Sequence, residues 1–82
     1  MDKYEFEMYT EFLEYYSQYT LRELMVLRKH LLRRWKLVTD ISAQNLIRDE
    51  IKIELEAIDS TIRDLHVEHI VRNMTVSVSK KG

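Results

Sequence analysis

The hydrophobic positions in the first part of the chain recur with the period of an α-helix. Between residues 3 and 17, the acidic residues Glu7, Glu11 and Glu14 follow one another at spacings of four and three, and most intervening positions are aromatic or aliphatic. Such spacing places the carboxylates on one face of a helix and the apolar side chains on the other. We therefore predict a first amphipathic helix over residues 3–17.

A second helix is predicted from residue 20 to residue 38. It begins with T-L-R-E, in which the hydroxyl of Thr20 can accept a hydrogen bond from the backbone of Glu23 while the Glu23 carboxylate reaches back. This pattern is a capping box, a signal for the N-terminus of a helix. Leu24 and Leu31 follow two turns apart, which indicates a buried face.

A third, longer helix is predicted from residue 42 to residue 72. Its apolar positions follow at spacings of four, four, three, four and three, as in a narrow coiled-coil seam: Ile47, Ile51, Leu55, Ile58, Ile62 and Leu65. The chain has no proline, and its only glycine is the last residue, so short turns should join the helices. These patterns predict an all-α antiparallel three-helix bundle with a long third helix. The alternating β-branched residues of 73–82 predict a flexible or strand-like tail.

Composition limits what such a bundle can do. The 82 residues allow one domain, which we place at residues 1–72. The chain has no cysteine, no apolar run long enough to span a membrane, and an acidic N-terminus unlike a secretion signal, so we expect a cytoplasmic protein without membrane contact. His66 and His69 are one helical turn apart, but no third ligand follows at a suitable spacing. We therefore expect no metal, no cofactor and no catalytic centre.

Charge changes sign from one predicted helix to the next. Residues 1–19 hold one basic and five acidic side chains, residues 20–38 hold six and one, and residues 39–69 hold three and eight. Four cations share one side of the second helix, which we call the basic face: Arg22, Lys29, Arg33 and Lys36. We expect this face chiefly to complement the acidic helices beside it, because a run of charge is usually a solvated face. The alternative is that it contacts the phosphates of a nucleic acid.

Aromatic residues are concentrated near the N-terminus, where seven lie within the first nineteen positions. They can fill the space between helices, with each tyrosine hydroxyl at the rim of the core. They can equally anchor a partner, because tyrosine is enriched at the energetic centres of interfaces. The candidates for partner contact are Tyr4, Phe6, Tyr9 and Tyr16. We expect at least one of the three tyrosines to be exposed.

The third predicted helix is longer than the other two. At about 1.5 Å per residue it spans roughly 45 Å, against roughly 23–28 Å for the others, so part of it must project beyond them. Each large apolar side chain left in water there forfeits roughly 1.5–3 kcal/mol. We therefore expect self-association, most simply as a homodimer. The residues expected to form that contact are Ile62, Leu65, Val67, Ile70 and Val71, widened by Leu46 and Ile53.

These features predict a small protein–protein interaction module, such as an adaptor, inhibitor or assembly factor, that occupies the surface of another protein. The alternative is a nucleic-acid-associated regulator that uses the basic face. An enzyme is not expected, because a chain this short could build a pocket with titrating groups only at a subunit interface.

Overall fold

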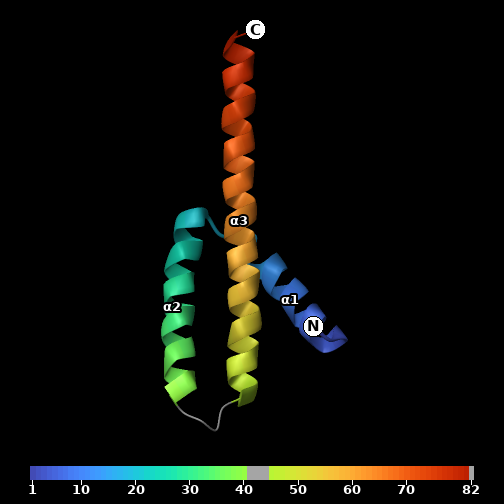
Figure 1. Ribbon diagram of the computed structural model, residues 1–82, viewed down its shortest axis with the longest axis vertical. Coiled ribbons are helices and arrows are strands. Elements are labelled where there is room, and N and C mark those ends of the chain that lie inside the picture. The colour runs from blue at the N-terminus through green and yellow to red at the C-terminus, as the bar shows by residue number, and fades with distance from the viewer. Residues whose placement is uncertain (41–44, 82) are drawn as a thin grey trace.

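Three helices make up the described part of the protein, which comprises residues 1–40 and 45–81. In the computed structural model these helices are α1 (Lys3–Tyr16), α2 (Leu21–Asp40) and α3 (Asn45–Lys81). Figure 1 shows α2 running antiparallel to α1 and α3. The predicted all-α antiparallel three-helix bundle with a long third helix is confirmed.

Local capping signals set the starts of α1 and α2. The Asp2 side chain accepts a hydrogen bond from the backbone of Glu5 at 2.8 Å and so caps α1. At α2, the Thr20 hydroxyl accepts from the Glu23 backbone at 3.2 Å, and the Thr20 backbone donates to the Glu23 carboxylate at 3.0 Å. The predicted capping box is therefore confirmed. The predicted start of the third helix at Ser42 lies outside the described residues.

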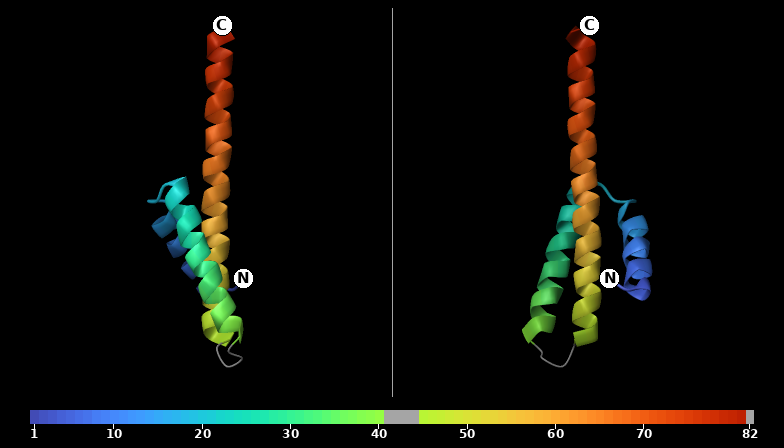
Figure 2. Two further views of the ribbon diagram at one scale, coloured as in Figure 1. Left: turned by 90° about the vertical axis from the view of Figure 1, so that its left-hand side faces the viewer. Right: turned by 45° about the vertical axis from the view of Figure 1, so that its right-hand side comes forward.

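The long helix α3 is the centre of the bundle, and the other two helices pack on different sides of it (Figures 1 and 2). Both α1 and α2 make most of their contacts with α3 and few with each other. The core between the helices consists of Tyr16, Leu24, Leu31, Ile51 and Ile58, of which Leu24 and Ile58 are fully buried. The fold therefore depends on α3, because neither shorter helix covers the other.

The C-terminal part of α3 projects beyond the other two helices (Figures 1 and 2). Leu65 is the last residue of α3 that packs against the core, and we call residues 66–81 the overhang. The predicted end at residue 72 is wrong, because α3 continues to Lys81. Residues 73–81 of the predicted flexible or strand-like tail over 73–82 are therefore helical, and residue 82 lies outside the described residues. No glycine or proline interrupts it. Extending a helix is easier than starting one, and β-branched residues lower helix propensity only slightly.

Candidate interaction surfaces

The outward side of α2 carries basic and apolar side chains together. Arg22 lies two residues before the buried Leu24, and Arg33 lies two residues after the buried Leu31. Two residues correspond to about 200° around a helix, so both arginines point away from α3. We call this surface the outer face of α2; its members are the exposed residues Arg22, Met25, Val26, Lys29, Leu32, Arg33, Lys36 and Leu37. The basic face thus alternates with large apolar side chains that are 38% to 65% exposed.

The expected pairing of the basic face with the acidic helices is not met at Arg22, Lys29 and Arg33. None of these three forms an ion pair with another residue in the part of the chain that the structure describes. The cation that joins α2 to α3 is Arg28, whose Nε lies 2.6 Å from Oδ1 of Asp59. Arg28 lies at the edge of α2 nearest α3, whereas the basic face is directed into solvent.

Tyr16 belongs to the core and not to a partner surface. Its side chain is 3% exposed, and its hydroxyl donates a hydrogen bond to Oε1 of Glu54 on α3. Burial, and then the hydrogen bond and charge of Glu54, raise the pKa of Tyr16 above its usual value of 10.0. The prediction that Tyr16 contacts a partner is wrong, because its ring fills the space where α1 meets the other two helices.

Neighbouring rings form an aromatic cluster at the C-terminal end of α1. The ring centroid of Tyr15 lies 5.1 Å from that of Tyr16 and 5.4 Å from that of Tyr19, and both pairs are edge to face. The hydroxyls of Tyr15 and Tyr19 are 2.8 Å apart, and this hydrogen bond is the main cause of the raised pKa of Tyr19. At this end of α1 the space-filling interpretation therefore holds for the buried Tyr16, whereas Tyr15 is 50% exposed.

Aromatic side chains nearer the N-terminus are more open to solvent. Tyr4 is 64% exposed and Phe6 is 59% exposed, which confirms that at least one tyrosine of the candidate set is exposed. Tyr9 is half-buried, and its hydroxyl lies 2.8 Å from Oγ of Ser60 on α3. Phe6 and Tyr9 line a groove between α1 and a polar part of α3 that includes Arg63. Contact of Tyr4 and Phe6 with a partner stays a prediction.

The overhang carries a short apolar stripe made of Val67, Ile70, Val71 and Met74. The first three are each 54% exposed and Met74 is 64% exposed. Met74 is not among the residues predicted from the sequence, although it lies seven residues, or about two turns, after Val67. Val67 in turn follows Leu65 by two residues, which correspond to about 200° around the helix. The stripe therefore lies on the side of α3 that faces away from Leu65.

Other residues predicted for self-association lie outside this stripe. Ile53 is 5% exposed, and Ile62 and Leu65 are partly buried against the core. Ile53 is therefore covered by the bundle, and Ile62 and Leu65 are less open to a second chain than expected, because they pack against the core. Self-association through these residues stays a prediction. Leu46 is 71% exposed, but it lies near the opposite end of α3, roughly 30 Å from Val67 along the axis.

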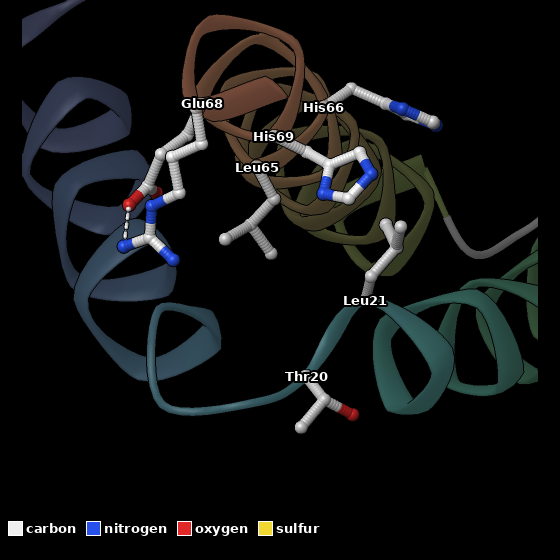
Figure 3. A pocket seen from close by; sticks show the side chains of 7 residues that line it. Thr20, Leu21, Leu65, His66, Glu68 and His69 are labelled. Carbon is white, nitrogen blue, oxygen red and sulfur yellow. Dashed lines mark hydrogen bonds and ion pairs between the residues drawn. The ribbon is translucent and has the colours of Figure 1, made fainter. Parts of the chain in front are cut away.

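A groove lies where the start of α2 meets the overhang. Figure 3 shows the His66 and His69 rings on adjoining turns of α3, near Leu21 at the start of α2. The Arg72 guanidinium donates to the Glu68 carboxylate at 2.8 Å, so it is already paired. No group of three or more metal-binding side chains occurs among the described residues. The two imidazoles are therefore fewer than the three protein ligands of a catalytic zinc site.

None of the helices formed by residues 1–40 and 45–81 is long and apolar enough to cross a membrane. Comparison with known proteins gives no match among protein families, curated proteins or solved structures. The function must therefore be inferred from the surfaces of the chain itself.

Proposed function

We propose that the protein is a protein–protein interaction module whose docking surface is the outer face of α2. The observation that carries this proposal is the mixture of side chains there, in which four cations alternate with four exposed large apolar residues. Arginine and methionine are enriched in protein interfaces, and apolar patches rimmed by polar groups mark interaction sites. Arg22, Lys29 and Arg33 form no ion pair with another described residue. A partner's carboxylates would therefore not have to displace one.

The partner expected for this face is a protein surface that combines carboxylates with apolar side chains, such as an acidic amphipathic helix. Four cations on one helix face attract such a surface during encounter, and the apolar side chains then bury against it. The bundle would act by covering that surface, as an adaptor, inhibitor or assembly factor. This mode of action requires no cofactor and no chemical step.

Nucleic acid is the second candidate for the outer face of α2. A row of cations is what a phosphate backbone requires, and this observation favours it. The large side chains between the cations are aliphatic or methionine, however, so they cannot stack on bases as aromatic rings do. The chain also has a net charge of −1, whereas nucleic-acid-binding domains usually carry a basic excess. A protein partner therefore fits this face better.

Two paired substitutions separate the proposal from this alternative. One reverses charge, by Lys29→Glu with Arg33→Glu, and the other removes apolar surface, by Met25→Ser with Leu32→Ser. The partner is captured from nuclease-treated lysate of the source cell, purified, and titrated against each variant by calorimetry. We expect both variants to weaken binding by roughly tenfold or more, and only the charge variant to reduce its salt dependence.

The matched control is Lys52→Glu, which reverses an exposed charge on α3 and should leave the affinity unchanged. Loss of the complex on nuclease treatment contradicts the proposal and favours nucleic acid. The proposal is also contradicted if the apolar variant keeps its full affinity for the partner and the protein binds duplex DNA tightly at physiological salt.

A further inference from the structure

Two segments of the chain carry the same arrangement of side chains with opposite charge. Residues 4–15 of α1 read Y-E-F-E-M-Y-T-E-F-L-E-Y, and residues 26–37 of α2 read V-L-R-K-H-L-L-R-R-W-K-L. In each segment the first and the last position are aromatic or aliphatic, and charges of one sign occupy the fourth, eighth and eleventh positions. These charges are Glu7, Glu11 and Glu14 in α1, and Lys29, Arg33 and Lys36 in α2.

The carboxylates of the first segment lie on the outward side of α1. Glu14 precedes the buried Tyr16 by two residues, which correspond to about 200° around the helix, so its side chain points away from the core. The other two carboxylates share this side, and none of the three forms an ion pair with another residue of 1–40 and 45–81. We call this surface the acidic face of α1; its members are the exposed residues Tyr4, Glu7, Glu11, Glu14 and Tyr15.

The acidic face of α1 and the outer face of α2 are complementary in charge, but they cannot meet within one chain. The two helices pack on different sides of α3, and both faces are directed away from it (Figures 1 and 2). We propose that the outer face of α2 of one copy binds the acidic face of α1 of a second copy. This inference rests on the docking role proposed for the outer face of α2, and it names one occupant of that face.

The apolar ends of the two segments select an antiparallel arrangement of α1 and α2. In each segment they lie on the same flank of the row of charges, because they stand three residues before the first charge and one residue after the last. Flanks of the same hand meet when one helix runs antiparallel to the other. In that orientation Tyr4 faces Leu37 of the other copy, and Tyr15 faces Val26. Both contacts form together because each segment spaces its ends by eleven residues, or about 16.5 Å.

The charges also meet in this orientation. Glu7 lies within one residue of the level of Arg33, and Glu11 lies within one residue of the level of Lys29, which corresponds to about 1.5 Å along the axis. Opposite charges that face each other across two helices favour that pairing and steer the encounter. The antiparallel arrangement therefore joins the charged and the apolar parts of both faces at once.

The contact joins unlike surfaces, so each copy keeps one free surface of each kind after it binds a single neighbour. Such a heterologous contact can repeat from copy to copy. It is about three helical turns long, and its charges are exposed and screened by salt, so we expect weak association that decreases as the ionic strength rises. Because the contact occupies the outer face of α2, self-association at high concentration would compete with the partner protein for that face.

Sedimentation equilibrium at low salt, from micromolar to millimolar concentration, tests this contact with two charge variants. One carries Glu7→Lys with Glu11→Lys, and the other carries Lys29→Glu with Arg33→Glu. Each variant alone should associate roughly tenfold or more weakly than the wild type. A mixture of the two should form a one-to-one complex with the affinity of the wild type and nothing larger. The first variant keeps only its outer face of α2, and the second keeps only its acidic face of α1.

The matched control is Asp49→Lys with Glu56→Lys, which changes the net charge by the same amount at exposed positions of α3 and should associate as the wild type does. A wild type that stays monomeric throughout the range overturns the inference. So does unchanged association of either charge variant, or a mixture without a complex. Circular dichroism checks that each variant remains folded. The proposed function is tested separately, because the captured partner can bind a chain that does not associate with itself.

Disulfide trapping tests the antiparallel arrangement, and the chain has no cysteine to interfere. A disulfide needs Cα atoms about 4.4–6.8 Å apart, whereas Val26 and Leu37 are separated by about 16.5 Å along α2. We expect Tyr4→Cys to cross-link with Leu37→Cys when the two variants are mixed and oxidised, and not with Val26→Cys. Preferential cross-linking of Tyr4→Cys with Val26→Cys overturns the arrangement, and so does the absence of cross-linking in both mixtures.

Discussion

Replacing Tyr16 with phenylalanine tests how α1 is held against α3. The change keeps the ring, which is 3% exposed in the core, and removes only the hydroxyl that donates to Glu54. A hydrogen bond to a charged group contributes about 1.5–3 kcal/mol. Glu54 is only half-buried and can regain a water molecule, so we expect a loss at neutral pH near the lower limit, about 1.5 kcal/mol.

The same substitution should change how stability depends on pH in alkaline solution. In the folded protein the pKa of Tyr16 is raised above 10.0, first by burial and then by the hydrogen bond and charge of Glu54. The unfolded chain titrates Tyr16 near the usual value, so above it the unfolded state has released a proton that the folded state keeps. The free energy of unfolding then falls by up to about 1.4 kcal/mol for each pH unit. Tyr16 contributes fully below pH 10.0, and its contribution is lost as the pH rises toward the folded pKa.

Urea unfolding, followed by circular dichroism from neutral pH to about pH 11, measures both effects. The advantage of the wild type over Tyr16→Phe should be largest at neutral pH and should shrink above pH 10.0. Tyr4→Phe is the control, because Tyr4 is 64% exposed and should behave as the wild type does throughout. An equal alkaline slope in wild type and Tyr16→Phe refutes the reasoning, as does a neutral-pH loss that Tyr4→Phe shares.

Two further substitutions test the packing and the start of α2. Leu24→Ala empties a position that is 0% exposed and should lower the free energy of unfolding by about 2–5 kcal/mol, whereas Met25→Ala at a 56% exposed position should change it by less than about 0.5 kcal/mol. Equal effects of the two in urea unfolding would contradict the assigned core. Thr20→Ala removes the hydroxyl that accepts from the Glu23 backbone and should lower the melting temperature by a few degrees, which Thr20→Ser should largely restore. An unchanged melting temperature in calorimetry would show that this cap does not stabilise α2.

Features that depend on neighbouring residues could be predicted from the sequence. The start of α2 is an example, because both capping partners, Thr20 and Glu23, lie within one turn. The end of α3 lies nine residues beyond the predicted residue 72, because the β-branched residues after residue 73 do not stop the helix. Such residues lower helix propensity only slightly, and no glycine or proline occurs before the last residue. Without a stop signal, the helix continues.

Features that depend on tertiary placement could not be predicted in the same way. Tyr4 and Tyr16 fit the same helical pattern, but only Tyr16 reaches the core between the helices, so only Tyr16 is buried. Likewise, the helix lengths showed that an overhang exists but not that it starts after Leu65, since that point depends on where α2 begins. That the stripe faces away from Leu65 could have been predicted from the sequence. The step of two residues from Leu65 to Val67 interrupts the spacing of threes and fours that the core requires.

The helix α3 runs without interruption from the core into the overhang. The number of residues between them therefore sets both the distance of the stripe from the core and the direction in which the stripe faces. A helix is a screw, so each added residue advances a side chain by about 1.5 Å and turns it by about 100°. One residue inserted between Leu65 and Val67 would therefore swing the stripe through about a quarter of a circle relative to the outer face of α2. Seven inserted residues would move the stripe about 10.5 Å outward and leave its direction nearly unchanged. The direction of the stripe relative to the outer face of α2 is thus fixed, and the distance between the two surfaces can change with little change of direction only by insertions close to whole helical turns, such as seven or eleven residues.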